Sequence, residues 1–300
     1  MFPLPKGKQN WRHFPPNCAC AQDSANGYAT ASRYPFVIPS GMLPLMWHRF
    51  ERSRAYRPKR EWVITGAALA RPWEDLYFSS GDGVRLNAWY FPANPDSPHR
   101  EWAVLLCHGN GGNVSHRLGT VALLLELGLS VLVFDYRGYG RSEGIPSEAG
   151  TYLDAQAAFA WLRQRGFAAA HIIAFGESLG GGVATELATR ETVGGLVLQS
   201  TFTSLPDAGA DLFPWLPVRW LSRLRYDSRA KLAALTVPVL VLHSRADRLV
   251  PFHHAERNFA TLRGPRLLRE TQGDHNDSIR TDLANTKAAL GEFLGLLKSG

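Results

Sequence analysis

Gly176-Glu177-Ser178-Leu179-Gly180 lies between an apolar run that ends at Phe175 and a run of small, helix-compatible residues. Glycines two positions before and after a serine allow the sharp strand-to-helix turn that leaves the serine hydroxyl exposed. The pentapeptide alone is weak evidence, because a glycine-rich chain can match it by accident. Here the apolar run before it and the helical run after it supply the context that such a turn requires. The sequence therefore predicts that Ser178 is a nucleophile.

A second glycine-rich turn, His108-Gly109-Asn110-Gly111-Gly112-Asn113, follows the apolar run Trp102 to Cys107. Its glycines expose backbone N–H groups. The N–H of Asn110, together with that of Leu179 directly after the nucleophile, would stabilise negative charge on the carbonyl oxygen of an attacked ester. The first turn of the helix after Ser178 adds a partial positive charge. We expect His108 to shape this turn by hydrogen bonding rather than to transfer protons.

Two further turns supply an acid and a base. Asp247 follows the apolar run Val237 to Leu242, and His275 follows the strand candidate Arg266 to Thr271. The chain order Ser178, Asp247, His275 is that of the α/β-hydrolase triad and differs from the orders of chymotrypsin-like and subtilisin-like enzymes. We predict that His275 is the base and that Asp247 orients it.

Asp207 and Asp274 are the alternatives to Asp247 for the acid. Asp207 lies further along an insertion, and Asp274 is too close in sequence to His275 to orient the imidazole easily. Asp247 is favoured by its position after a strand. Arg137 and Arg141 could bind an acidic substrate, but structural roles are at least as consistent with their loop.

Apolar runs and amphipathic helical patterns alternate from residue 102 onward, which predicts a mostly parallel sheet with helices on both faces. An Asp-Gly turn between 74–79 and 85–91 predicts an antiparallel hairpin at its start. Residues 201–235 are too long for an ordinary connection and are expected to form a small cap. Within this cap Leu212, Phe213 and Trp215 are candidate substrate-binding residues; the alternative is that they only pack the cap onto the domain. The predicted strands span 102–107, 130–134, 171–175, 195–199, 237–242 and 266–271, and the predicted helices span 115–127, 147–165, 179–190, 252–262 and 279–297.

Five stretches of the chain form a distinctive combination: Asp135 to Gly144 (DYRGYGRSEG), Pro146-Ser147-Glu148, Phe202-Thr203-Ser204-Leu205, Asp247 to Pro251 and His275-Asn276-Asp277. Together they resemble the Bem46-like α/β-hydrolases, and the resemblance extends from about Tyr56 to Leu297. The resemblance implies an α/β-hydrolase fold and a serine hydrolase, in a family that borders the serine aminopeptidase-like and acyl-protein thioesterase branches.

Composition and charge indicate one large domain and argue against a nucleic-acid partner or a metal site. An apolar content of 45% in 300 residues suffices for one large core. The net charge of +7 comes mostly from scattered arginines, so we expect no nucleic-acid partner. Cys18 and Cys20 have no second Cys/His cluster near them and make a poor metal site, and triad chemistry requires no metal or cofactor. Oligomeric state is not predicted.

The first 55 residues are expected to be an N-terminal extension, partly disordered, before a catalytic domain over residues 56–300. Their most apolar segment, Tyr34 to Trp47, is about 14 residues long and carries three prolines, whereas a bilayer span needs about 20 residues. No apolar run follows the early lysines as in a secretory signal. We expect a cytoplasmic protein, with peripheral membrane contact left open.

The leading hypothesis is a serine hydrolase that cleaves carboxylic esters or thioesters through an acyl-enzyme. One alternative is a serine aminopeptidase-like peptidase, which would need a carboxylate pocket for a free amino terminus. Another, of a different class, is a non-catalytic binding protein on a hydrolase fold.

Overall fold

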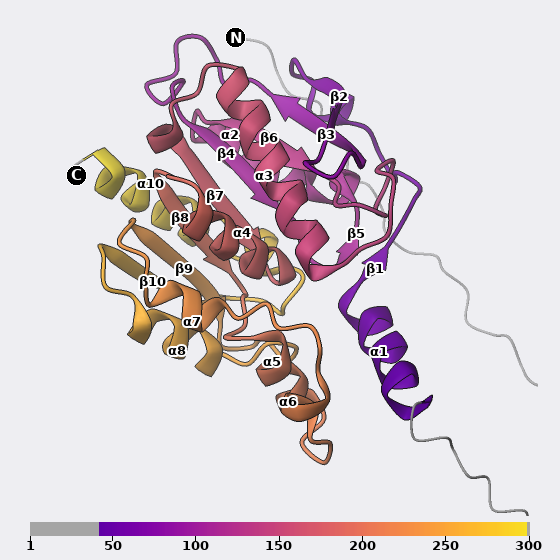
Figure 1. Cartoon of the computed structure of the whole chain (residues 1–300). Helices are drawn as coiled ribbons and strands as arrows, with labels where there is room; N and C mark the ends of the chain where they lie inside the picture. Colours follow the sequence, from indigo (N-terminus) through magenta and orange to yellow (C-terminus); the bar gives the residue numbers. More distant parts are fainter. Residues whose placement is uncertain (1–41, 299–300) are drawn as a thin grey trace, which may run out of the picture. The chain divides into compact units, whose positions relative to one another are not determined.

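The computed structural model describes residues 42–298. Residues 1–41, with Cys18, Cys20 and most of the expected extension, lie outside the described residues. The described residues all belong to one compact unit. Its centre is an eight-stranded sheet of order β10-β9-β8-β7-β4-β6-β3-β2 (Figure 1). The strands are β2 (Glu74–Ser79), β3 (Arg85–Phe91), β4 (Ala103–Cys107), β6 (Ser130–Phe134), β7 (Ile172–Glu177), β8 (Gly195–Gln199), β9 (Val239–Ser244) and β10 (Arg266–Thr271).

The sheet has an antiparallel start and a parallel remainder, as the sequence predicts. β2 and β3 form an antiparallel hairpin, and β3 is also antiparallel to β6. From β6 to β10 all neighbours are parallel. Because parallel strands need crossovers, helices alternate with them and cover both faces. A separate two-stranded sheet pairs β1 (Arg57–Pro58) with β5 (Gly111–Gly112).

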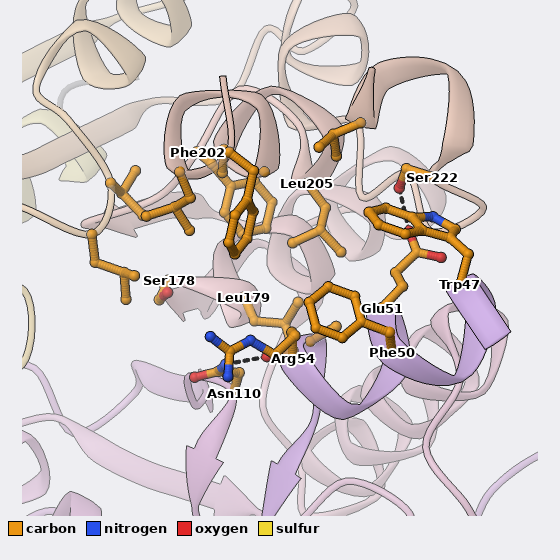
Figure 2. Close-up of a pocket in the computed structure, with 18 residues that line it drawn as sticks. Trp47, Phe50, Glu51, Arg54, Asn110, Ser178, Leu179, Phe202, Leu205 and Ser222 are labelled. Carbon is orange, nitrogen blue, oxygen red and sulfur yellow. Dashed lines mark hydrogen bonds between the residues drawn. The ribbon is translucent and has the colours of Figure 1, made fainter. Parts of the chain in front are cut away.

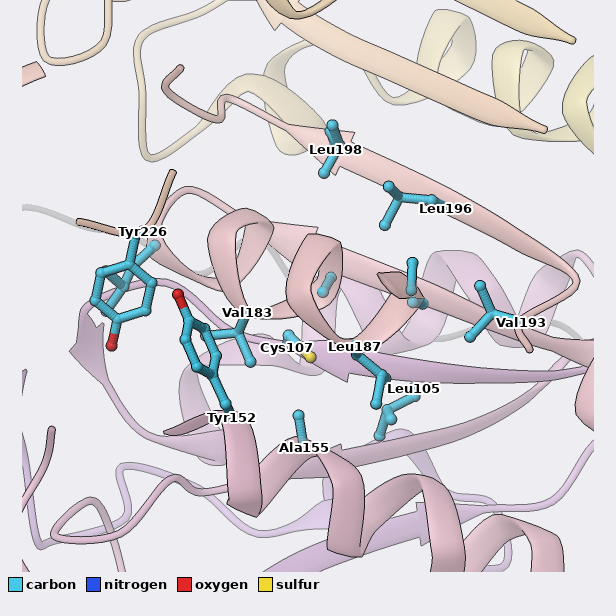
Figure 3. Packing of buried hydrophobic residues seen from close by; sticks show 14 of the residues in the cluster. Leu105, Cys107, Tyr152, Ala155, Val183, Leu187, Val193, Leu196, Leu198 and Tyr226 are labelled. Carbon is cyan, nitrogen blue, oxygen red and sulfur yellow. The ribbon is translucent and has the colours of Figure 1, made fainter. Parts of the chain in front are cut away.

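Alternate residues of the buried strands point to opposite faces, so the sheet divides the core in two. In β4, Leu105 and Cys107 pack on one face, whereas Val104 and Leu106 pack on the other. The first face is covered by α3 and α4, with Ala155 and Val183 against the strands (Figure 3). The helices of this side are α3 (Glu148–Gln164), α4 (Leu179–Arg190), α7 (Ser228–Leu232) and α8 (His253–Thr261), and those of the other are α2 (Leu118–Glu126), α9 (Ser278–Thr281) and α10 (Leu283–Lys298).

The predicted fold class, a mostly parallel α/β-hydrolase sheet with helices on both sides, is confirmed. Strand bounds agree with the sequence to within about two residues, and the last predicted helix is divided into α9 and α10. The expected cap contains the short helices α5 (Leu205–Leu212) and α6 (Val218–Leu221), followed by α7. Before the sheet lies a helix that the sequence did not indicate, α1 (Met42–Ala55).

Candidate active site

Ser178 occupies a strained turn between β7 and α4. Its φ of 51° and ψ of −113° lie in a region that residues with a side chain rarely adopt. The flanking glycines are sterically required here. A Cβ on Gly176 would lie 2.4 Å from the carbonyl oxygen of Gly180, and one on Gly180 would lie 1.9 Å from the carbonyl oxygen of Cys107. The glycine spacing in the sequence thus has a direct cause in the packing of this turn.

The structure brings Ser178, Asp247 and His275 together in one chain of contacts. Nε2 of His275 lies 3.0 Å from the Ser178 hydroxyl, and Nδ1 of the same ring lies 2.7 Å from Oδ2 of Asp247. Asp247 and His275 are buried. This is the geometry in which a carboxylate fixes the imidazole with its free nitrogen facing a nucleophile.

The two alternative acids are placed elsewhere. Asp207 accepts hydrogen bonds from Thr203 and Arg219, away from the imidazole. Asp274 accepts the backbone N–H of His275 at 2.8 Å but does not contact its ring. Hydrogen bonds from this N–H and from the backbone N–H of Arg248 lower the pKa of Asp274. Of these carboxylates, only Asp247 has the position of an orienting acid.

The two candidate oxyanion donors are positioned in different ways, the N–H of Asn110 by a side-chain hydrogen bond and that of Leu179 by its place at the start of α4. Nδ1 of His108 donates to the carbonyl of Gly109 at 2.7 Å. That carbonyl shares its peptide plane with the N–H of Asn110, so His108 sets the direction of the donor. The other donor, Leu179, opens α4, where the first N–H groups have no acceptor within the helix. Asn110 and Leu179 both line the cavity that contains Ser178.

Burial keeps the His108 ring neutral, and its hydrogen bond to the Gly109 carbonyl places the single ring proton on Nδ1. Burial lowers the pKa of His108 to about 3. Its Nε2 lies 3.6 Å from Oδ1 of Asp135, and burial raises the pKa of this carboxyl to about 8. A neutral imidazole beside a neutral carboxyl avoids buried charge. His108 is therefore a positioning group with its proton on Nδ1.

A cavity of about 150 Å³ lies beside Ser178. Its wall is mostly apolar and comes from the cap, from the loops after β8 and β9, and from α1 (Figure 2). Leu212 and Phe213 of the predicted substrate-binding set are in this wall. Trp215 is not: its side chain is 73% exposed and its ring packs edge-on against Phe213. The residues that line the cavity are Trp47, Phe50, Glu51, Arg54, Ala55, Asn110, Ser178, Leu179, Phe202, Leu205, Ala208, Gly209, Leu212, Phe213, Val218, Ser222, Leu249 and Val250.

Helix α1 supplies a wall that the sequence interpretation did not assign to the site. The boundary expected at residue 56 leaves this helix outside the catalytic domain, yet Trp47, Phe50 and Arg54 line the cavity. The buried carboxylate of Glu51 accepts the backbone N–H groups of Arg223 and Leu224 and the Ser222 hydroxyl. It thereby fastens α1 to the segment after α6. Spacings of three and four residues place these four side chains on one face once α1 is known to be a helix, but this spacing does not show what that face contacts.

The two loop arginines differ in their roles. Arg137 is buried between Asp82 and Asp154, at 2.7 and 2.8 Å, and these bonds hold the loop after β6. Arg141 lies over the ring of Trp62, 3.5 Å from its centroid. Neither lines the cavity.

Among residues 42–298, one group of side chains has ligand atoms close enough for a metal ion: Asp211, His253 and His254. The backbone N–H of Thr203 donates to Nδ1 of His254 at 3.1 Å, so the ring proton lies on Nε2, 2.9 Å from Asp211. A protonated Nε2 cannot coordinate a cation. The cluster instead ties α5 of the cap to α8.

The fold and the site together define an α/β-hydrolase. The family model of the alpha/beta hydrolase fold matches residues 103–227. An uncharacterized protein of Mycobacterium tuberculosis is 40% identical over 243 residues, covering 80% of this chain and 85% of that protein. The alpha/beta hydrolase domain-containing protein WAV2 of Arabidopsis thaliana is 33% identical over 257 residues, covering 78% and 82%. Protein bem46 of Schizosaccharomyces pombe is 32% identical over 200 residues, covering 64% and 66%. The chain belongs to this Bem46-like family of α/β-hydrolases.

Solved structures agree on the fold. The esterase Pf2001 of Pyrococcus furiosus superposes with a TM-score of 0.67 at 22% identity, covering 82% of this chain and 98% of that one. At this identity the likeness concerns architecture, and activity has to be argued from the site. No helix within residues 42–298 is both long and apolar enough to cross a membrane.

Proposed function

We propose that this protein is a serine hydrolase that cleaves carboxylic esters or thioesters through an acyl-enzyme. The observation that carries the proposal is the contact chain from the Ser178 hydroxyl to Nε2 of His275 and from Nδ1 to Asp247. A base within hydrogen-bond reach of a nucleophile, itself oriented by a third group, is the arrangement of covalent acyl transfer.

In this mechanism the Ser178 oxygen attacks the carbonyl carbon of the substrate while its proton passes to Nε2 of His275. The carbonyl oxygen gains negative charge and is stabilised by the N–H groups of Asn110 and Leu179. The imidazolium returns the proton to the departing alcohol or thiol, which leaves the acyl group on Ser178. Water, deprotonated by the same imidazole, then hydrolyses the acyl-enzyme.

The cavity supports an acyl substrate over a peptide. An aminopeptidase-like reading requires a carboxylate that is free to pair with a substrate ammonium. The carboxylate in the cavity wall, Glu51, is already occupied by backbone N–H groups of Arg223 and Leu224 and by Ser222. An apolar wall that includes Phe202, Leu205 and Phe213 suits a hydrocarbon chain instead.

The test is labelling with a fluorophosphonate, followed by hydrolysis of 4-nitrophenyl butyrate and butyryl thiocholine. We expect one label per chain, at Ser178, and turnover of at least one substrate. Ser178→Ala should abolish both. A protein that takes no label and cleaves no ester or thioester would be the non-catalytic alternative.

A further inference from the structure

Arg54 is the cavity's one charged side chain that lacks an ionic partner among the described residues. Two charged residues, Glu51 and Arg54, stand in the wall. Glu51 is buried and occupied by hydrogen-bond donors of the segment after α6. Arg54 forms no ion pair with any described carboxylate, and it makes a long cation–π contact with Phe50, whose ring centroid lies 5.9 Å from Cζ. The guanidinium is thus a positive charge left available to a ligand.

The position of Arg54 is fixed relative to the reacting atoms. Nδ2 of Asn110 donates to its backbone carbonyl at 3.2 Å, which joins the end of α1 to the turn that carries an oxyanion donor. Figure 2 shows the guanidinium reaching toward the end of the cavity where Asn110 and Ser178 lie. A group bound to Arg54 would therefore lie near the scissile bond and not at the far end of the acyl chain.

The cavity has a buried apolar interior and a solvent-exposed edge, and these would receive different ends of a substrate. Phe202, Ala208 and Val250 in the wall are each at most 5% exposed, and they form the apolar interior. Arg54 is solvent-exposed and therefore lies at the open edge of the cavity. In an ester the hydrocarbon chain would occupy the interior, so the leaving alcohol or thiol is the part that meets Arg54.

We infer that Arg54 selects substrates whose leaving group carries an anion. The inference rests on the proposed hydrolase function and names its substrate class: an apolar acyl chain on an alcohol or thiol bearing a carboxylate or a phosphate. A guanidinium matches both anions because its planar fork can donate two parallel hydrogen bonds. Arg54 is a specificity-determining residue in this scheme and takes no part in proton transfer.

The experiment compares ester pairs that differ only in charge. One pair is 3-carboxy-4-nitrophenyl butyrate and its 3-carbamoyl isostere; the other is the monobutyryl ester of glycerol 3-phosphate and that of glycerol. For the wild type we expect kcat/KM to favour the anionic member by about tenfold at low salt, and less at high salt. Arg54→Gln should lower that ratio about tenfold through KM, Arg54→Lys should retain part of it, and Arg54→Glu should invert it.

Arg49→Gln is the matched control, because Arg49 is an exposed arginine of the same helix that does not line the cavity. It removes the same net charge and should leave both ratios unchanged. A response of the phosphate pair alone, or of the carboxylate pair alone, supports the inference and identifies the anion. If the wild type hydrolyses the esters but its kcat/KM ratio of anionic to neutral substrate is near one, the inference is overturned. The same holds if this ratio is equal in Arg54→Gln and in the wild type. A wild-type protein that hydrolyses none of these esters and is not labelled at Ser178 would overturn the hydrolase function and the inference together.

Discussion

Asp247 holds His275 through a 2.7 Å contact between Oδ2 and Nδ1, while its other oxygen accepts the backbone N–H groups of Leu249 and Val250 at 2.9 and 2.8 Å. The backbone of the residues that follow Asp247 therefore fixes its carboxylate independently of the contact with the imidazole. In this way a residue of the loop after β9 orients a ring that comes from the loop after β10.

Replacing Asp247 should remove the orientation but keep the shape of the site. Asp247→Asn is expected to lower kcat by about 10⁴, and Ser178→Ala by about 10⁶, as in well-studied triads. The asparagine can present an N–H to Nδ1 and so favours the wrong tautomer of His275. Steady-state kinetics with 4-nitrophenyl butyrate measure both effects.

Asp274→Asn is the control for this substitution, since Asp274 precedes the base but contacts only its backbone N–H. We expect kcat within about threefold of the wild type, as for exposed positions outside a triad. A loss as large as that of Asp247→Asn would assign the orienting role to the wrong carboxylate.

His108→Ala should weaken catalysis without weakening binding. Loss of the bond from Nδ1 to the Gly109 carbonyl frees the peptide that carries the Asn110 N–H, so the oxyanion donor loses its fixed direction. We expect kcat to fall by about 10² with KM nearly unchanged, which is the scale of losing one oxyanion donor. Asn110→Ala keeps the backbone N–H and should cost far less. Equal losses in the two variants would contradict a backbone role for Asn110.

Acid should destabilise the fold through buried neutral histidines. Burial lowers the pKa of His254 from 6.5 to about 4. Between these values the unfolded chain binds a proton at His254 that the folded chain does not, so the contribution of His254 to the free energy of unfolding rises with pH and is lost on acidification. Each such group contributes a slope of up to about 1.4 kcal/mol per pH unit.

His254→Asn keeps an acceptor for the Thr203 N–H but removes this titration. Urea unfolding at several pH values from 4.5 to 7.5 should show a smaller slope for the variant below pH 6.5 and parallel curves above it. The slope that remains in the variant is the balance between His108 and His243, whose pKa values burial also lowers, and Asp135, whose raised pKa of about 8 acts in the opposite direction. Parallel curves over the whole range would remove His254 from this account.

The sequence predicted those parts of the site whose requirements are local. The glycines beside Ser178 are demanded by contacts within a single turn, and Asp247 and His275 follow strands whose carboxyl ends meet at one edge of a parallel sheet. The apolar runs and the Asp-Gly turn that predict the strands and the hairpin also lie within short stretches of sequence. The strands of the sheet were therefore predicted to within about two residues.

Helix α1 and the cavity depend on contacts between distant segments, so the sequence indicated them poorly. Glu51 meets its partner Ser222 across 171 positions, and no local pattern specifies that meeting. In the cap, the apolar residues Phe213 and Trp215 are two positions apart in an irregular segment, where no helical or strand period tells which one faces inward. Only Phe213 lines the cavity.

Acyl-chain preference should follow the cavity and stop where it is full. A void of about 150 Å³ resembles engineered apolar cavities that take up benzene, so it suits an acyl group of about six carbons. Each buried methylene can contribute up to about 0.8 kcal/mol, reduced by the apolar surface that a chain already meets outside the cavity. We therefore expect kcat/KM to rise about threefold per methylene from acetyl to about hexanoyl esters and then to level off.

Ala208→Phe and Trp215→Ala separate the cavity from the rest of the cap. Ala208 is buried in the cavity wall on α5, so a phenyl group there should fill the void and move the plateau to acyl groups about three carbons shorter. Trp215 lies outside the wall, and its replacement should leave the slope and the plateau unchanged because no methylene of a bound chain touches it. Chain-length series from acetyl to decanoyl in the three proteins decide the matter. A plateau that Ala208→Phe does not shift, or one that Trp215→Ala does, would place the acyl chain on the outer surface of the cap.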